Sequence, residues 1–155
     1  MADNSKLIQE VKDHWEDEVC GTRNMVGNEI NSESHKIVTD HRYLVEPHIQ
    51  EFLNFSANVD KDFILEIGVG AGTDFIQICK QSKLAYGIDL TDAAIKITQD
   101  RCELEGIKNY NLQKVNAANL PYRDDFFDYV YSYGVIHHAP DTMSILSEIK
   151  RVSKP

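Results

Sequence analysis

Three glycines follow a short apolar run, at Gly68, Gly70 and Gly72 of the segment ILEIGVGAGTDF (residues 64–75). An apolar strand, a glycine loop and a helix form the arrangement that turns backbone N–H groups toward a bound ligand. Glu66 lies two residues before the first glycine, where its carboxylate would repel a pyrophosphate but attract a positively charged ligand. Two structural interpretations remain open. The glycines could form only a tight turn, and Glu66 could be a strand-end residue that accepts hydrogen bonds from loop amides.

Two further positions bear on the ligand. A dinucleotide fingerprint has a third Gly or Ala three residues after the second glycine, and this position is Thr73. Asp89 lies in the next apolar run, LAYGIDL, 17 residues after Gly72, where a carboxylate can accept both hydroxyls of a ribose. Its alternative role, a helix N-cap, suits Thr91 better. Asp89 therefore predicts an adenosine-containing ligand, which nicotinamide and adenosyl cofactors both satisfy.

The elements that must position these residues alternate between strand and helix. Four strands are predicted, at residues 63–69, 84–90, 111–117 and 127–135, and the first of them is a continuous apolar run. Helical patterns follow at 74–82, at 91–106 and after Asp141, where Ile145, Ile149 and Val152 share one face. Such alternation predicts an α/β fold with a Rossmann-like parallel sheet, helices on both of its faces and strand order 3-2-1-4.

The first 60 residues have a different pattern. An amphipathic helix is predicted over residues 5–19 from four apolar positions spaced by three, four and four: Ile8, Val11, Trp15 and Val19. The polar stretch 20–36 has no period and predicts a loop or flexible lid. A second helix is expected from about Pro47, with three residues buried: Ile49, Phe52 and Leu53. We therefore expect an N-terminal helical leader or lid over 1–60 and a core over 61–155.

Composition excludes several classes of function. The 155 residues carry 16 basic and 25 acidic side chains, a net charge of −9, which argues against nonspecific binding to nucleic acid or to an anionic membrane. No apolar run approaches the roughly 18–20 residues of a membrane span, and the polar N-terminus is unlike a secretory signal. Cys20, Cys79 and Cys102 form no CxxC pair. They predict reduced thiols in a cytoplasmic protein, with no zinc site.

Several segments together resemble the class I S-adenosylmethionine-dependent methyltransferases. They are ILEIGVGAGTD, YGIDLT, NAANLPYRDDFFDYVYSYGVIHHAPD and the ending IKRV. The chain is most similar to the type 11 small-molecule group, over residues 63–155. HWEDEVCGTR and YLVEPHI also resemble a leader that, in a subset of this group, helps to close the cofactor site.

This resemblance implies a role for each matching residue. The backbone of Gly68, Gly70 and Gly72 would wrap the methionine and ribose of S-adenosylmethionine, and Glu66 would hold the loop and face the cofactor's positive end. Asp89 would bind the ribose hydroxyls. Leu90 would pack against the adenine, and Asn116 and Ala117 would recognise its polar edge. Three residues would lie beside the methyl group: Ser132, Tyr133 and His137. The family usually has Asp where Asn116 stands, and asparagine keeps a carbonyl acceptor there.

The implied activity is in-line transfer of a methyl group to a small-molecule acceptor, which requires alignment and exclusion of water more than acid–base groups. Three alternatives remain: a nicotinamide-dependent oxidoreductase, a nucleic-acid methyltransferase and a noncatalytic cofactor-binding or interaction module. Thr73 breaks the dinucleotide fingerprint and so weighs against the oxidoreductase, and SYGV stands where amino-directed nucleic-acid enzymes have a Pro-Pro-Tyr type turn.

The two adjacent histidines, His137 and His138, invite a metal or a catalytic interpretation. Neighbouring side chains on a strand point apart and rarely chelate one ion, so we expect no metal here. His137 is a candidate base because imidazole titrates near neutrality; packing of one ring on the cofactor is the alternative.

The last expectation concerns the fourth strand. RVSKP ends the chain where the family usually continues with further strands, so the core is expected to be incomplete and the fourth strand to form an edge. This strand is apolar and has no Lys or Pro to block pairing. The sequence therefore predicts self-association, or pairing with another chain, through this edge, and little methyl transfer by a lone monomer.

Overall fold

The structure is a computed structural model that describes residues 4–17, 19–22, 31–56 and 62–155. Its centre is a sheet of four parallel strands in the order β3-β2-β1-β4. The strands are β1 (Phe63–Ile67), β2 (Leu84–Asp89), β3 (Tyr110–Lys114) and β4 (Tyr129–Tyr131). This topology confirms the predicted parallel sheet and its 3-2-1-4 order.

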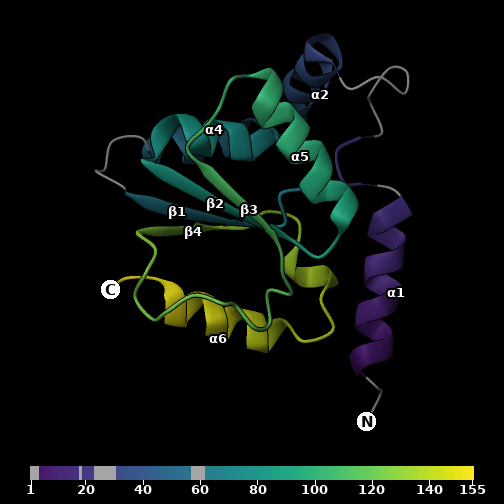
Figure 1. Ribbon diagram of the computed structural model, residues 1–155, viewed down its shortest axis with the longest axis vertical. Coiled ribbons are helices and arrows are strands. Elements are labelled where there is room, and N and C mark those ends of the chain that lie inside the picture. Colours follow the sequence, from purple (N-terminus) through teal and green to yellow (C-terminus); the bar gives the residue numbers. More distant parts are fainter. Residues whose placement is uncertain (1–3, 18, 23–30, 57–61) are drawn as a thin grey trace.

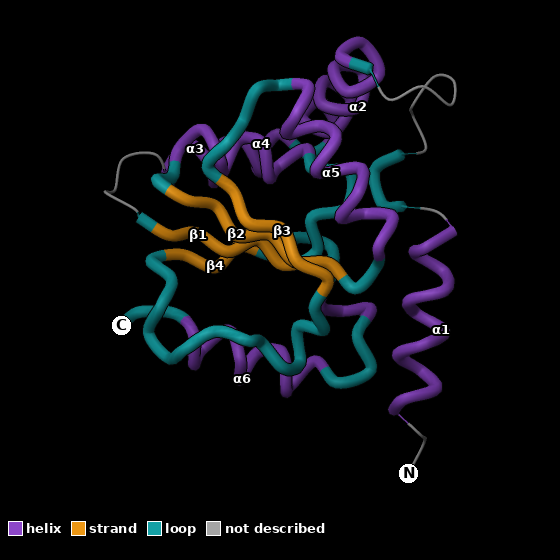
Figure 2. The backbone as a smooth tube through the Cα atoms, viewed as in Figure 1, coloured by secondary structure: helices purple, strands orange, loops and turns teal. Residues whose placement is uncertain are grey.

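Helices cover both faces of the sheet (Figure 1). One face carries α2 (Ser32–Val45), α3 (Pro47–Ser56), α4 (Thr73–Gln81) and α5 (Asp92–Leu104). The opposite face carries α6 (Thr142–Val152), which is joined to β4 through the short 3-10 helix η1 (Ile136–His138). Helix α1 (Asn4–Asp17) stands beside the carboxyl ends of the strands (Figure 2).

Alternate residues of β1 point to opposite faces and pack into two separate cores. Ile64 packs with buried residues of α3 and α4, whereas Leu65 and Ile67 pack with Phe127 and Val152 on the α6 face. The strand is covered on both faces, and this explains why its sequence is continuously apolar rather than alternating. Glu66 is the exception in this run, and it too is buried.

The structure corrects the prediction of a loop over residues 20–36. Helix α2 begins at Ser32, capped by Asn31, whose side chain accepts a hydrogen bond from the Ser34 backbone N–H at 2.9 Å. The Ser34 hydroxyl in turn binds the Asn31 backbone N–H at 3.1 Å. Ser34 replaces the Glu or Gln usual in this capping box, so the sequence signal is weak. Residues 23–30 of the predicted lid lie outside the described residues.

Three smaller expectations also differ from the structure. Phe52, predicted to be buried, is 45% exposed beside β4. Helix α1 ends at Asp17, so the buried Val19 lies beyond it. Strand β4 is limited to three residues because Phe127 pairs instead with Ser153 in an isolated parallel bridge.

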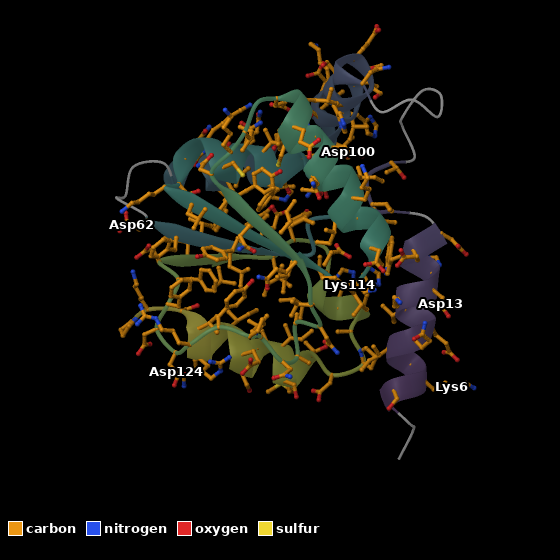
Figure 3. All side chains as sticks on the ribbon, in the orientation of Figure 1. Lys6, Asp13, Asp62, Asp100, Lys114 and Asp124 are labelled. Atoms are coloured by element: carbon orange, nitrogen blue, oxygen red, sulfur yellow. The ribbon has the colours of Figure 1, made fainter. Side chains whose placement is uncertain are left out.

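Many charged side chains lie on the outside of the fold, whereas Glu66, Asp74 and Arg101 are buried. Figure 3 shows this for four exposed residues: Lys6, Asp13, Asp62 and Asp124. None of the helices built from the described residues is long and apolar enough to cross a membrane.

Candidate cofactor-binding site

The glycine loop leaves the carboxyl end of β1 in a conformation that requires glycine. Gly68 has φ +82° and donates its N–H to the carbonyl oxygen of Ile88 at 2.8 Å. Gly70 has φ +51°, and a Cβ there would lie 2.9 Å from the backbone oxygen of Cys20. A side chain at Gly70 would therefore strain the backbone and displace the segment that follows α1.

A cavity of about 430 Å³ opens where this loop meets the ends of the strands. Most of the residues assigned to the cofactor on sequence grounds line it: Glu66, Gly68, Gly70, Asp89, Leu90, Asn116, Ala117 and Tyr133. Ligands of open α/β sheets bind at this edge, beside the point where the strand order reverses. In this sheet the reversal lies at β1, between β2 and β4.

Glu66 is a buried carboxyl group with an unused oxygen. The residue is 3% exposed, and its Oε2 has no hydrogen-bond partner among the described residues. Burial raises its pKa well above the ordinary value, the charge of Asp74 adds to this effect, and Arg42 only partly offsets it. A carboxyl group in this position suits a ligand that brings positive charge.

Asp74, by contrast, is saturated with hydrogen bonds. Arg42 donates to it from Nε, at 3.0 and 3.2 Å, and from Nη2, at 2.6 Å. The hydroxyls of Tyr43 and Tyr131 donate at 3.1 and 2.9 Å. Burial raises the pKa of both phenols, which keeps them protonated as donors. Arg42 is therefore committed to Asp74 and does not neutralise Glu66 directly.

Asp89 joins the glycine loop to the start of α5. One oxygen accepts from the Gly70 N–H at 3.2 Å, and the other accepts from the backbone N–H and hydroxyl of Thr91 at 3.0 and 2.9 Å. Thr91 caps α5 by accepting the Ala94 N–H at 3.3 Å, as predicted. Each carboxylate oxygen has room for more than one hydrogen bond, so Asp89 is held in place while it can still accept a donor from the cavity.

The structure does not bring all of the predicted residues to the cavity. Gly72, Ser132 and His137 are absent from its described lining. Gly72 packs instead against Thr98, and the Ser132 hydroxyl donates to the Ile67 carbonyl oxygen at 3.2 Å.

His138 lines the cavity in place of His137. The expectation that the two imidazoles point apart is wrong, because their centroids lie 4.0 Å from each other. The reason is local: these residues form a 3-10 turn rather than a strand. No group of three or more potential metal ligands occurs among the described residues.

Helix α1 closes one side of the cavity. Its residues Ile8, Val11 and Trp15 line it, and the Trp15 ring meets His138 edge to face with centroids 5.3 Å apart. The carboxylate of Glu16 accepts the first backbone N–H groups of α5, from Asp92 at 3.2 Å and Ala93 at 3.0 Å. These contacts hold α1 against both η1 and α5.

Sequence reasoning missed the polar groups that α2 and α3 contribute. Arg42 and Glu46 line the cavity beside Tyr133. The Tyr133 hydroxyl lies 2.8 Å from Glu46 Oε1 and 3.0 Å from His48 Nε2. The only signal was a charged pair four residues apart, Arg42 and Glu46, in the expected leader, and its partners lie about 30 and 90 residues further along the chain.

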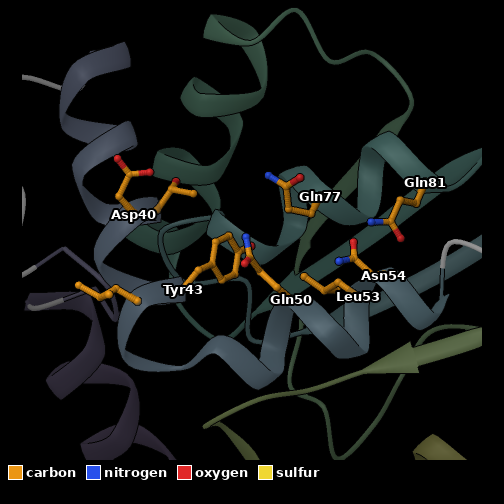
Figure 4. A pocket seen from close by; sticks show the side chains of 9 residues that line it. Asp40, Tyr43, Gln50, Leu53, Asn54, Gln77 and Gln81 are labelled. Carbon is orange, nitrogen blue, oxygen red and sulfur yellow. The ribbon is translucent and has the colours of Figure 1, made fainter.

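A second cavity lies between α2, α3 and α4 (Figure 4). Its walls are mostly neutral polar side chains, among them Gln50, Asn54, Gln77 and Gln81. It includes no residue of the glycine loop. We therefore assign the ligand site to the first cavity.

Comparison with known proteins agrees with this geometry. The family model described as a methyltransferase domain matches residues 65–155. Demethylmenaquinone methyltransferase of Geobacillus stearothermophilus is 36% identical over 70 residues, which are 45% of this chain and 30% of that protein. Norajmaline N-methyltransferase of Rauvolfia serpentina is 31% identical over 94 residues, 59% of this chain and 32% of that protein. The chain spans about a third of the length of these curated relatives.

Solved structures show the same fold. YcgJ of Bacillus subtilis superposes with a TM-score of 0.65 at 24% identity, over 68% of this chain and 45% of that one. A SAM-dependent methyltransferase from Aquifex aeolicus also gives a TM-score of 0.65, at 22% identity, over 79% of this chain and 67% of that one.

The chain belongs to the class I S-adenosylmethionine-dependent methyltransferase family. The family identifies the cofactor as S-adenosylmethionine, which the sequence predicted, and it decides against the nicotinamide alternative. The buried, unpartnered oxygen of Glu66 fits the positive charge of this cofactor, and Asp89 fits its ribose.

Proposed function

We propose that this chain forms the cofactor-binding part of a methyltransferase that acts on a small-molecule acceptor. The observation that carries the proposal is the cavity itself, which joins the glycine loop, Glu66, Asp89 and the 115–117 segment in one space. S-adenosylmethionine would supply an activated methyl group there. The protein would bind the cofactor, align the acceptor and exclude water.

The donor side of the cavity would be held by a few groups. Asp89 would accept the ribose hydroxyls, and Glu66 would lie toward the positive charge. Leu90 would pack on the adenine, and Asn116 would accept its amino group. The Asn116 side-chain oxygen already accepts the Ala118 N–H at 3.0 Å, and a carbonyl oxygen has a second lone pair for this purpose.

Three further features of the proposal rest on the arrangement of the elements. The segment 1–60 would act as a helical leader and α1 as a lid, since α1 lines the cavity. Within the described residues, β4 pairs only with β1, and this leaves one edge for self-association or a partner chain. A cytoplasmic location is supported by the buried thiols of Cys79 and Cys102, which form no disulfide.

Relatives named as demethylmenaquinone and norajmaline methyltransferases support a small-molecule acceptor. The net charge of −9 weighs against nucleic acid. The second candidate is a noncatalytic cofactor-binding module, favoured by the unpaired edge of β4 beside the Tyr133 end of the cavity.

Radiolabelled methyl transfer to a panel of quinols, phenols and amines tests the proposal. Label transferred to any panel member by the wild type, and lost in Asp89→Ala, supports a methyltransferase. Cofactor binding without transfer to any member supports the noncatalytic module.

A further inference from the structure

Tyr133 lines the cavity just after the end of β4, and two side chains hold its hydroxyl in place. Its hydroxyl is 2.8 Å from Glu46 Oε1 and 3.0 Å from His48 Nε2. The guanidinium carbon of Arg42 lies 5.3 Å from the centre of its ring, and Arg42 also binds Glu46 at 3.0 Å. The phenol is therefore fixed by partners from both α2 and α3.

The hydrogen-bond directions at this phenol follow from its partners. A carboxylate only accepts, so the single proton of Tyr133 points to Glu46, and His48 must donate its Nε2–H to the phenol oxygen. The hydrogen bond to Glu46 raises the pKa of Tyr133, which keeps the phenol neutral. One lone pair of the phenol oxygen then remains, and it can accept a hydrogen bond but has no proton to give.

Charge around the cavity restricts the ligand further. Four carboxyl groups line it: Glu46, Glu66, Asp74 and Asp89. Arg42 is the one Lys or Arg in the described lining, and its guanidinium already binds Asp74 and Glu46. An anionic ligand would meet uncompensated negative charge, so the cavity disfavours anions.

We propose that Tyr133 selects the methyl acceptor, binding the hydroxyl of a neutral, apolar acceptor through its phenol oxygen, with Glu46 and His48 as positioning residues. The apolar body of such an acceptor would lie against the aliphatic and aromatic lining, which includes Trp15, Val135 and Ile145. This inference rests on the proposed function, because it assigns the acceptor half of the same cavity.

The test uses three naphthalene probes of similar size and measures their dissociation constants by calorimetry on the full chain saturated with S-adenosylhomocysteine. 1-Naphthol offers a donor, 1-methoxynaphthalene offers none, and 1-naphthoate is an anion. For the wild type we expect 1-naphthol to bind about tenfold more tightly than 1-methoxynaphthalene, the range of one net hydrogen bond, and 1-naphthoate to bind most weakly.

Two variants separate this specific contact from a general structural role. Tyr133→Phe should weaken the binding of 1-naphthol and leave the binding of 1-methoxynaphthalene unchanged, so that the ratio of their dissociation constants falls to about one. Glu46→Ala frees the phenol proton for the ether oxygen, so 1-methoxynaphthalene should gain affinity relative to 1-naphthol. Tyr110→Phe removes a phenol that does not line the cavity and should keep the wild-type ratio.

Equal binding of 1-naphthol and 1-methoxynaphthalene to the wild type, no binding of either, or a wild-type ratio in Tyr133→Phe would overturn the proposal. Binding of S-adenosylhomocysteine is measured first in every sample. Failure at that step contradicts the proposed function, whereas cofactor binding without probe selectivity contradicts only the role of Tyr133.

Discussion

Arg42 donates two hydrogen bonds from Nε and one from Nη2 to the carboxylate of Asp74, at 2.6 to 3.2 Å. This pairing uses the cation that acts on the pKa of Glu66, and no ion pair joins Glu66 to another of the described residues. A carboxyl group in such a place lowers the stability of the empty protein whenever it must ionise. We expect the positive charge of the bound cofactor to compensate the carboxylate of Glu66.

Glu66→Gln should therefore stabilise the protein without cofactor and weaken the binding of the cofactor. The folded-state pKa of Glu66 is raised, so folded and unfolded chains bind the same number of protons below the ordinary carboxyl pKa and again above the raised pKa. Above that value the unfolded chain ionises first, and wild-type stability falls with rising pH until the raised pKa is reached. The gain in Tm for Glu66→Gln should grow over the same interval.

Thermal unfolding across pH, with and without S-adenosylmethionine, provides the measurement. Glu51→Gln on the exposed side of α3 is the matched control and should change neither quantity. A loss of stability in Glu66→Gln at neutral pH would show that the carboxylate is satisfied in the empty protein.

Asp89→Ala should weaken the binding of S-adenosylmethionine by about 1.5–3 kcal/mol, the scale of hydrogen bonds to a charged group. Asp89 also accepts the Gly70 N–H, so part of this loss will come from a less ordered loop. Asp89→Asn keeps an acceptor and removes the charge, and it should show an intermediate loss in calorimetry. An unchanged dissociation constant in Asp89→Ala would remove this residue from the site.

Glu16→Ala should speed the release of cofactor by several fold. The carboxylate holds α1 against the first N–H groups of α5, and each such charged hydrogen bond contributes on the order of 1 kcal/mol. Trp15 is the single tryptophan of the chain and lines the cavity, so its fluorescence can report dissociation in stopped flow. Glu10→Ala, which removes an exposed ion pair with Lys6, is the control. Identical release rates in both variants would argue against α1 as a lid.

The free edge of β4 should lead to self-association. Phe52 is 45% exposed, with its ring 5.8 Å from that of Tyr131 on this strand, and an apolar edge with an apolar neighbour promotes pairing. Light scattering after size exclusion should give a mass above that of one chain, reduced in Phe52→Ser but not in Leu104→Ser. A monomer at tens of micromolar would contradict the prediction.

The core of the fold could be predicted from sequence because its signals are local. A continuous apolar run identified β1, and a threonine directly before a helical pattern identified the cap of α5. Strand ends were less certain, since β4 is limited by the pairing of Phe127 with Ser153, a contact between distant segments.

The site was predicted in part, for the same reason. Glu66 and Asp89 were found because their spacing from the glycines is fixed by the strand–loop–helix unit. Tyr133 was predicted, but its contact with Arg42 and the pairing of Arg42 with Asp74 were missed. These contacts depend on how α2 packs against the sheet and α4, and no spacing along the chain encodes this packing.

Titration of the purified chain with S-adenosylmethionine in a calorimeter is the most direct test of the central claim, that the cavity at the glycine loop is an S-adenosylmethionine site. NAD serves as the control ligand because Asp89 alone would suit either one. The account predicts saturable binding of S-adenosylmethionine at one site per chain, with a rise in Tm and no binding of NAD. A folded protein that shows neither heat of binding nor a Tm shift at millimolar S-adenosylmethionine would contradict it.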